Sequence, residues 1–256
     1  MSDSVRSKKW SAEEAPGFWW HRLPGMNYEP AIYSDLSESE WAIVAEWFEE
    51  TSRAGQVDEV SVPLMSFLHG LVLGNRAERI VQLGTHAGYS ALLLGFMLRR
   101  MNARRGLFTI DIDPASLAAG RQWIRRAKLE DFVQVAEGDF LDPATVQAAK
   151  DYFGTAPELI ILDNSHEYSA TVRQLDLWYG AHAYGGMLVV HDVSRFSQNL
   201  DATKEGGVRR AFVEWRAAHP ECESFLLNPN EESIDSPRPF YKDARGLGLI
   251  HKPRAK

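Results

Sequence analysis

From about residue 78 onward, short apolar runs alternate with stretches of helical periodicity. The runs at 79–84, 159–163 and 186–192 are almost entirely apolar, which is typical of strands buried on both faces of a parallel sheet. Further strands are predicted at 107–112, 132–138, 224–228 and 247–251. This alternation predicts a doubly wound α/β fold, in which ligands bind outside the carboxyl ends of the strands.

A different pattern precedes the alternating region. Ser37, with Glu40 three positions later, gives residues 37–50 the signature of a helix with a capping box, and 61–74 reads as a second helix. Residues 15–33 are rich in aromatic residues and proline, as expected of a lid, a dimer arm or an ordered strap. We therefore expect an N-terminal helical extension over 1–59 and the sheet domain over 60–256.

Charge and composition exclude several classes of protein. The net charge is −7, and the basic residues are scattered, which disfavours a nucleic-acid partner. Cys222 is the only cysteine, so a reducing compartment is expected. The first ten residues lack the apolar segment of a signal peptide, and the longest apolar run, at 91–98, is shorter than the roughly 20 residues of a membrane helix. We expect a soluble cytoplasmic protein without a membrane partner.

Glycines and acidic residues follow the first two strands. Gly84 and Gly88 bracket a turn that leads into a helix opened by Ser90. Glycines let the backbone approach a ligand closely, and the N–H groups of the helix can bind an anion. Asp111 ends the second strand, where an acidic residue binds the ribose diol in nucleotide-binding folds. The alternative role of helix cap suits Asp113 better than Asp111.

Gly138 and Asp139 follow the third strand. Asp139 could accept a hydrogen bond from an adenine amino group, or cap the next helix, although Asp142 can do that itself. The turn after the first strand lacks the third glycine of G-x-G-x-x-G, which argues against NAD, and it lacks the G-K-[ST] of a P-loop. The glycine turn, the ribose acid and the Gly-Asp pair are more specific together than any one alone.

At these motifs the sequence resembles class I S-adenosylmethionine-dependent methyltransferases. Within that class it is similar to the metal-dependent O-methyltransferases, both the catechol type and the bacterial natural-product sugar methyltransferases with their cephalosporin-biosynthesis relatives. The resemblance spans roughly residues 60–251 and lies in "VQLGTHAGYSALLL", "TIDIDP", "EGDF", "LDNSHEYSATVRQLDLW" and "GGMLVVHDV". It implies a Rossmann-like sheet of seven strands, mostly parallel, with an antiparallel seventh strand.

The resemblance also implies the cofactor S-adenosyl-L-methionine and the residues that bind it. Relatives often carry an acidic residue near the cofactor's amino group where this chain has Gln82, which can accept a hydrogen bond but supplies no charge. Ser90 would lie near the methionine carboxylate. The implied cofactor-binding residues are Gln82, Gly84, Thr85, Gly88, Ser90, Asp111, Gly138, Asp139 and Asp163.

The ends of the fourth and fifth strands match the metal site of the catechol-type enzymes. By this resemblance Asp163, His191 and Asp192 are metal ligands, and His166 is the base that takes the hydroxyl proton. Carboxylates suit Mg²⁺, whereas an imidazole ligand admits Mn²⁺ or Fe²⁺. Three alternatives remain: His166 caps the following helix, His191 only orients Asp192, or the site works without a metal and Asp163 orients His166.

We expect an O-methyltransferase that acts on a small hydroxylated acceptor, such as a natural-product sugar or a phenol, and that forms a homo-oligomer. An aromatic or glycosidic acceptor is favoured by Trp19, Trp20, Tyr28 and Tyr33. A hydroxylase-like metal enzyme and a non-catalytic cofactor-binding subunit are the alternatives, and an NAD-binding protein is the least favoured.

Overall fold

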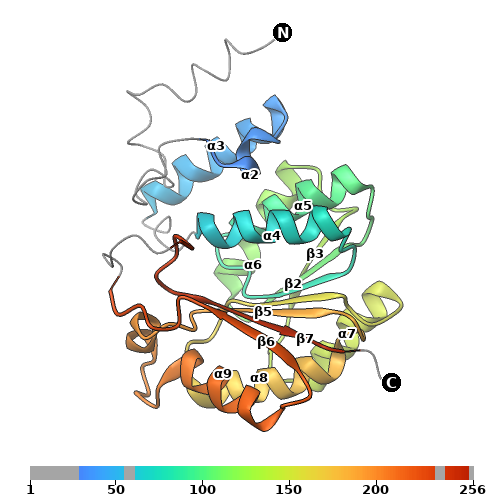
Figure 1. Cartoon of the computed structure of the whole chain (residues 1–256). Coiled ribbons are helices and arrows are strands. Elements are labelled where there is room, and N and C mark those ends of the chain that lie inside the picture. Colours follow the sequence, from blue (N-terminus) through green and yellow to red (C-terminus); the bar gives the residue numbers. More distant parts are fainter. Residues whose placement is uncertain (1–28, 55–60, 234–239, 254–256) are drawn as a thin grey trace.

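A seven-stranded sheet runs through the centre of the molecule (Figure 1). The structure, a computed structural model, describes residues 29–54, 61–233 and 240–253. The strands are β1 (Ile80–Leu83), β2 (Leu107–Asp111), β3 (Val133–Glu137), β4 (Leu159–Leu162), β5 (Met187–His191), β6 (Glu223–Leu227) and β7 (Leu247–His251). Six of the seven predicted runs contain one of these strands, and the run predicted at 224–228 overlaps β6 with an offset of one residue, so the predicted strands are confirmed.

The strand order is β3-β2-β1-β4-β5-β7-β6. The first five strands are parallel, and β7 runs antiparallel to both β5 and β6. Because β7 is reversed, its first residue, Leu247, pairs with His191 at the carboxyl end of β5. Residues that precede β7 therefore reach the same edge of the sheet as the residues that follow the parallel strands.

Helices cover both faces of the sheet (Figure 1). One face carries α4 (Val62–Asn75), α5 (Tyr89–Met101) and α6 (Pro114–Arg126), and the other carries α7 (Pro143–Phe153), α8 (Tyr168–Ala181) and α9 (Gly207–Ala218). Side chains alternate between the two cores along each strand: in β4, Leu159 and Ile161 face the first core, and Ile160 and Leu162 face the second. This arrangement confirms the doubly wound α/β fold.

Two further helices pack outside the first layer. They are α2 (Ala31–Ser34) and α3 (Glu38–Arg53), which contact α4 and α5 respectively. The predicted capping box is present, since the side chain of Ser37 accepts from the Glu40 N–H and Glu40 accepts from the Ser37 N–H. Glu40 also pairs with Arg99 of α5 at 2.6 Å. Residues 1–28 lie outside the described residues, so the lid, arm or strap stays a prediction.

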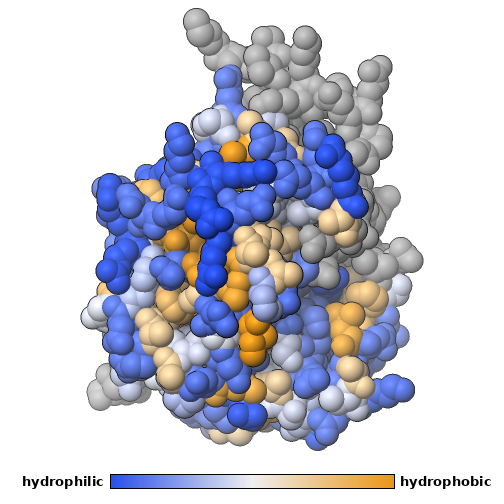
Figure 2. All heavy atoms as spheres, turned by 180° about the vertical axis from the view of Figure 1, so that it is seen from behind, coloured by the Kyte–Doolittle hydropathy of each residue, from blue (hydrophilic) through white to orange (hydrophobic). Residues whose placement is uncertain are grey.

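On the face shown in Figure 2, hydrophilic residues predominate and hydrophobic residues form small groups between them. The exposed large hydrophobic side chains in the described part of the chain are Ile112, Tyr184, Leu200, Val213, Phe225 and Phe240. In the same part of the chain, no helix has both the length and the apolar character that a bilayer span requires.

Candidate active site

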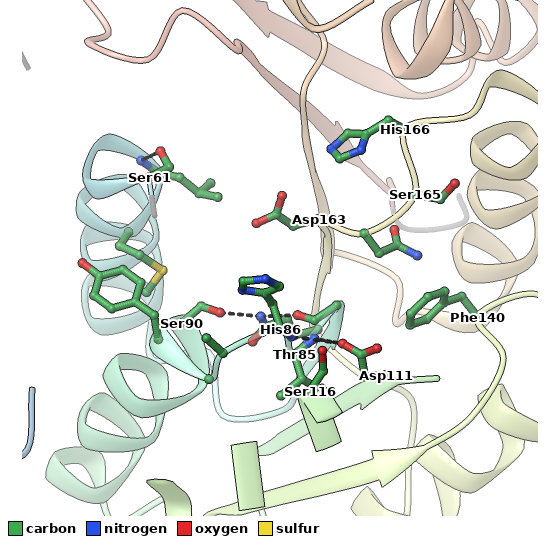
Figure 3. Close-up of a pocket in the computed structure, with 18 of the residues that line it drawn as sticks. Ser61, Thr85, His86, Ser90, Asp111, Ser116, Phe140, Asp163, Ser165 and His166 are labelled. Atoms are coloured by element: carbon green, nitrogen blue, oxygen red, sulfur yellow. Dashed lines mark hydrogen bonds between the residues drawn. The ribbon is translucent and has the colours of Figure 1, made fainter. Parts of the chain in front are cut away.

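A cavity of about 480 Å³ opens at the carboxyl ends of β1 and β4, where the strand order reverses. Such a reversal is the usual ligand site of a doubly wound sheet, and the volume suits a small molecule. Figure 3 shows Asp163 and His166 at one end of the cavity and Asp111 and Phe140 at the other. The short 3₁₀ helix η4 (Phe196–Leu200) adds Leu200 to the wall.

Asp111 holds the glycine turn in place. Its Oδ2 atom accepts hydrogen bonds from the N–H groups of Thr85 and His86 at 2.9 and 3.0 Å, and its Oδ1 atom accepts from Ile112 and Asp113. The carboxylate lines the cavity and is 9% exposed. The predicted ribose contact therefore stays a prediction, whereas the anchoring of the turn is a role that the sequence did not suggest.

Gln82 and Asn164 leave two buried polar atoms without a partner in the described part of the chain. The Nε2 atom of Gln82 donates to the Gly84 carbonyl and to the Ser90 hydroxyl, which leaves its Oε1 atom as a buried, unsatisfied acceptor. The Nδ2 atom of Asn164 is a buried, unsatisfied donor. Both residues line the cavity. Because buried polar atoms normally have partners, these two fit a ligand with both a donor and an acceptor, such as an amino acid end.

Gly138 and Asp139 do not line this cavity in the described structure. Asp139 is exposed, and its Oδ1 atom accepts from the Leu141 N–H at 2.9 Å. A Cβ on Gly138 would lie 2.8 Å from Thr145 Oγ1, so close packing accounts for that glycine. The contact between Asp139 and adenine stays a prediction. Asp142 caps α7 through the Ala144 N–H, as its position predicts.

Four predicted residues meet at the other end of the cavity, where Asp163 and His166 line the wall and His191 and Asp192 are buried behind it. The Oδ1 atom of Asp163 lies 2.9 Å from His191 Nδ1, which is 3.4 Å from Asp192 Oδ2. The Oδ2 atom of Asp192 also lies 3.2 Å from His166 Nε2. Asp163, His191 and Asp192 each offer a ligand atom, and the three atoms lie within 4.8 Å of one another. The side chain of His166 does not cap α8, whose N-cap is Glu167.

Asp192 is held rigidly in an uncommon backbone conformation. Its φ is 63°, in the left-handed region, where non-glycine residues are rare and often functional. Its Oδ1 atom accepts from the Ser197 hydroxyl at 2.9 Å, so its Oδ2 atom is the one directed at the two histidines. The strained turn and this bond fix the direction of the carboxylate.

Asp243 is a further member of this cluster that the sequence analysis missed. Its Oδ2 atom lies 2.9 Å from His191 Nε2 and also accepts from the Ser61 hydroxyl. A carboxylate at Nε2 keeps the proton on that nitrogen and leaves Nδ1 facing Asp163 and Asp192. The antiparallel direction of the seventh strand was the one signal that could have placed Asp243 at this edge.

The carboxylates raise the pKa of both histidines. Burial alone would lower the pKa of His191, but Asp192, Asp163 and Asp243 raise it well above its usual value. The hydrogen bond to Asp192 raises the pKa of His166 despite partial burial. Burial would raise the pKa of Asp192, but the charge of His191 and the bond from His166 lower it. In the described structure, the surrounding carboxylates therefore favour the protonated form of His191.

Apolar side chains from the N-terminal helices and from α5 complete the wall near Asp163. Trp47 of α3, Leu64 and Met65 of α4, and Tyr89 of α5 line the cavity. The indole of Trp47 donates to the Ala87 carbonyl at 2.8 Å, which ties α3 to the glycine turn. Sequence analysis predicted α3 and α4 but not which of their side chains would reach the site.

The aromatic residues predicted to face the acceptor are only partly described. Tyr33 is buried in α2 and its hydroxyl bonds to the hydroxyl of Tyr89, which lines the cavity. Trp19, Trp20 and Tyr28 lie outside the described residues. Their predicted contact with an acceptor therefore stays a prediction.

Known proteins share both the domain and the fold. Residues 81–193 match the family described as methyltransferase domain, Methyltransf_24. An O-methyltransferase from Bacillus cereus in complex with SAH is 21% identical, with a TM-score of 0.64, over 82% of this chain and 90% of that chain. The O-methyltransferase TomG from Streptomyces achromogenes, involved in tomaymycin synthesis and solved with SAM, is 18% identical, with a TM-score of 0.61, over 99% and 100%.

A third solved structure extends the likeness to a fungus. The SAH-bound methyltransferase PaMTH1 from Podospora anserina is 16% identical, with a TM-score of 0.62, over 86% of this chain and 92% of that chain. No curated protein sequence matches the chain. At these identities the structures establish the fold, and the family match covers the chain from β1 through β5 and the turn that follows it. Residues 81–193 therefore match a methyltransferase domain, and the chain shares its fold with solved O-methyltransferases.

Proposed function

We propose that the protein is an O-methyltransferase that moves a methyl group from S-adenosylmethionine to a hydroxyl group of a small molecule, assisted by a divalent cation. One observation carries this proposal. Asp163, His191, Asp192 and His166 meet within hydrogen-bonding distance at the edge of the cavity, although they come from the ends of two different strands and the loop after one of them.

The cofactor would extend along the glycine turn. The orphaned Oε1 atom of Gln82 suits the amino group of the methionine end, and the N–H groups at the start of α5, next to Ser90, suit its carboxylate. Asp111 and Phe140 lie at the opposite end of the cavity, where the nucleoside would bind. This orientation leaves Asp163, His166 and the apolar wall for the acceptor.

His166 is suited to remove the acceptor's hydroxyl proton. Asp192 accepts a hydrogen bond from Nε2 of His166, so the lone pair of the neutral imidazole is on Nδ1. When Nδ1 takes the proton, the oxygen attacks the sulfonium methyl group, a C–O bond forms and the C–S bond breaks, which releases S-adenosylhomocysteine. Asp192 stabilises the imidazolium that results, in the manner of the carboxylate of a catalytic triad.

The donor set fits a divalent cation. Two carboxylate oxygens and one imidazole nitrogen suit Mg²⁺, Mn²⁺ or Fe²⁺, and the Asp243 carboxylate orients the imidazole as in many metal sites. A bound divalent ion lowers the pKa of a hydroxyl and holds it in position. The alternative is a metal-free site in which protonated His191 is the cation, because both of its nitrogens already contact carboxylates.

The role of His166 is tested by His166→Ala, with His251→Ala on β7 as the matched control. Purified variants are titrated with S-adenosylhomocysteine and assayed for transfer of labelled methyl groups to a panel of catechols, hydroxycinnamates and sugars. We expect unchanged cofactor affinity and a loss of about 100-fold or more in turnover for His166→Ala, since a positioned base typically contributes that much. Undiminished turnover would remove His166 from the mechanism.

Chelation separates the metal-dependent site from the metal-free one. We expect dialysis against a chelator to abolish turnover, and Mg²⁺ or Mn²⁺ to restore it. Mn²⁺ titrated into the metal-free protein should bind, and Asp163→Asn should weaken that binding. Full turnover in chelator would favour protonated His191 as the resident cation. An absence of cofactor binding under either condition would count against the methyltransferase assignment itself.

A further inference from the structure

Arg245 lies at the same edge of the sheet as the candidate catalytic residues. It precedes β7, whose first residue, Leu247, pairs with His191 at the end of β5. Its N–H donates to Asp243 Oδ1 at 2.9 Å, and its carbonyl accepts from the Ser194 N–H at 2.9 Å. The backbone from which the guanidinium extends is therefore hydrogen-bonded to Asp243 on one side and to the loop after β5 on the other.

The guanidinium of Arg245 forms no ion pair within the described part of the chain, although its charge helps to lower the pKa of the nearby Asp192 carboxyl. Two other partly buried arginines pair with carboxylates, Arg79 with Glu158 at 2.5 Å and Arg99 with Glu40 at 2.6 Å. The side chains of Asp243 and Asp192 bond to His191 and His166 respectively. Arg245 nevertheless lines the cavity. A guanidinium placed in a ligand cavity without a protein partner is suited to a bidentate contact with an anionic group.

The other residues of the wall indicate the chemical character of the molecule that carries this anion. Among the described residues that line the cavity, Arg245 is the one with a permanent positive charge. The nearby wall is apolar and includes Trp47, Leu64 and Met65. We propose that Arg245 binds a carboxylate of the methyl acceptor; this proposal rests on the function proposed above. The acceptor is then a hydroxylated acid with an apolar or aromatic body.

The strand order argues that this carboxylate belongs to the acceptor and not to the cofactor. The cofactor-binding turn follows β1, whereas Arg245 precedes β7, and β4 and β5 lie between these two strands. At about 4.8 Å per strand, the separation is on the order of 14 Å. His166 and Asp163 lie between the two positions. Arg245 is thus on the far side of the reacting groups from the methionine end of the cofactor.

The test compares acids with their uncharged esters. Matched pairs of 3,4-dihydroxybenzoic, caffeic and hydroxyphenylacetic acids and their methyl esters are titrated by calorimetry into protein saturated with S-adenosylhomocysteine. We expect at least one acid to bind roughly 10-fold or more tightly than its ester, as a charged hydrogen bond predicts. Arg245→Gln should reduce that ratio to about one, Arg245→Lys should keep part of it, and Arg216→Gln on α9 should leave it unchanged.

Three results would overturn the proposal. The first is equal binding of every acid and its ester to the wild-type protein. The second is a preference for the acid that persists in Arg245→Gln. The third is a loss of S-adenosylhomocysteine affinity in Arg245→Gln, which would assign Arg245 to the cofactor. Since this is a binding experiment, it is separate from turnover. Acid binding that depends on Arg245 without any methyl transfer would overturn the proposed function and leave the carboxylate site standing.

Discussion

Replacing Gly84 by alanine should damage both the fold and the cofactor site. A Cβ built at this position lies 2.2 Å from the carbonyl oxygen of Asp163, about 1 Å closer than van der Waals contact allows. The residue also has φ +100°, a conformation that side chains rarely adopt. The contact lies between the ends of β1 and β4, and relieving it strains the bond from the Asp163 N–H to the Leu83 carbonyl.

The expected loss is the sum of three effects. A left-handed conformation costs a side chain about 1–2 kcal/mol, overpacking costs about 1–3 kcal/mol, and a weakened hydrogen bond costs about 1 kcal/mol. We expect Gly84→Ala to lose about 3–6 kcal/mol of unfolding free energy, or roughly 10–15 °C in melting temperature for a chain of this size. Affinity for S-adenosylhomocysteine should fall by about 10-fold or more, because the turn moves relative to Asp163.

Gly154→Ala is the matched control. Gly154 has φ +74° at the end of α7, and a Cβ there meets nothing within 4 Å, so this variant isolates the conformational strain at about 1–2 kcal/mol. Urea unfolding measures the stability of both variants, and calorimetry measures their cofactor affinity. If Gly84→Ala lost no more stability than Gly154→Ala, the close approach of the Asp163 carbonyl would not restrict the turn, and the reasoning would be refuted.

Two further predictions concern other groups. Asp243→Asn should weaken Mn²⁺ binding by about 10-fold without changing cofactor affinity, because the carboxylate that orients His191 is lost. Titration with Mn²⁺ checks this prediction, and an unchanged affinity for Mn²⁺ would remove Asp243 from the site. Burial, and secondarily Lys252, lowers the pKa of His182 to about 4. The unfolded chain therefore binds a proton below about pH 6.5 that the folded chain does not, and stability should fall by about 2 kcal/mol between pH 7 and pH 5. Urea unfolding at both pH values should show a smaller fall for His182→Leu; an equal fall would contradict the assignment.

Local hydrogen bonds were predictable from short stretches of sequence. Ser37, Asp113 and Asp142 cap their helices as predicted, because each cap bond joins residues only two or three positions apart. The strands were predictable for a similar reason. Burial on both faces of the sheet demands a continuous apolar run, and that pattern is visible without knowing which strands are neighbours.

The candidate site was predictable only where strand ends mark it. Asp163 and the pair His191 and Asp192 follow neighbouring parallel strands, so their contact follows from the topology. Asp243 contacts His191 across 52 positions in the chain, and Trp47 contacts the glycine turn across 40. No local pattern encodes such pairs, because they depend on the reversed β7 and on the packing of α3 against α5.

The sequence by itself determined the doubly wound fold, the helix caps, the glycine turn and the acidic and histidine residues at the strand ends. These features depend on periodicity and on bonds between near neighbours in the chain. Only the tertiary structure decided that His191 lies between carboxylates on both sides, that Asp111 anchors the turn, and that Arg245 lines the cavity without forming an ion pair in the described part of the chain. The physical reason is that hydrogen bonding and charge compensation depend on distance in space, and residues far apart in the chain acquire that distance only when the sheet and its helices pack together.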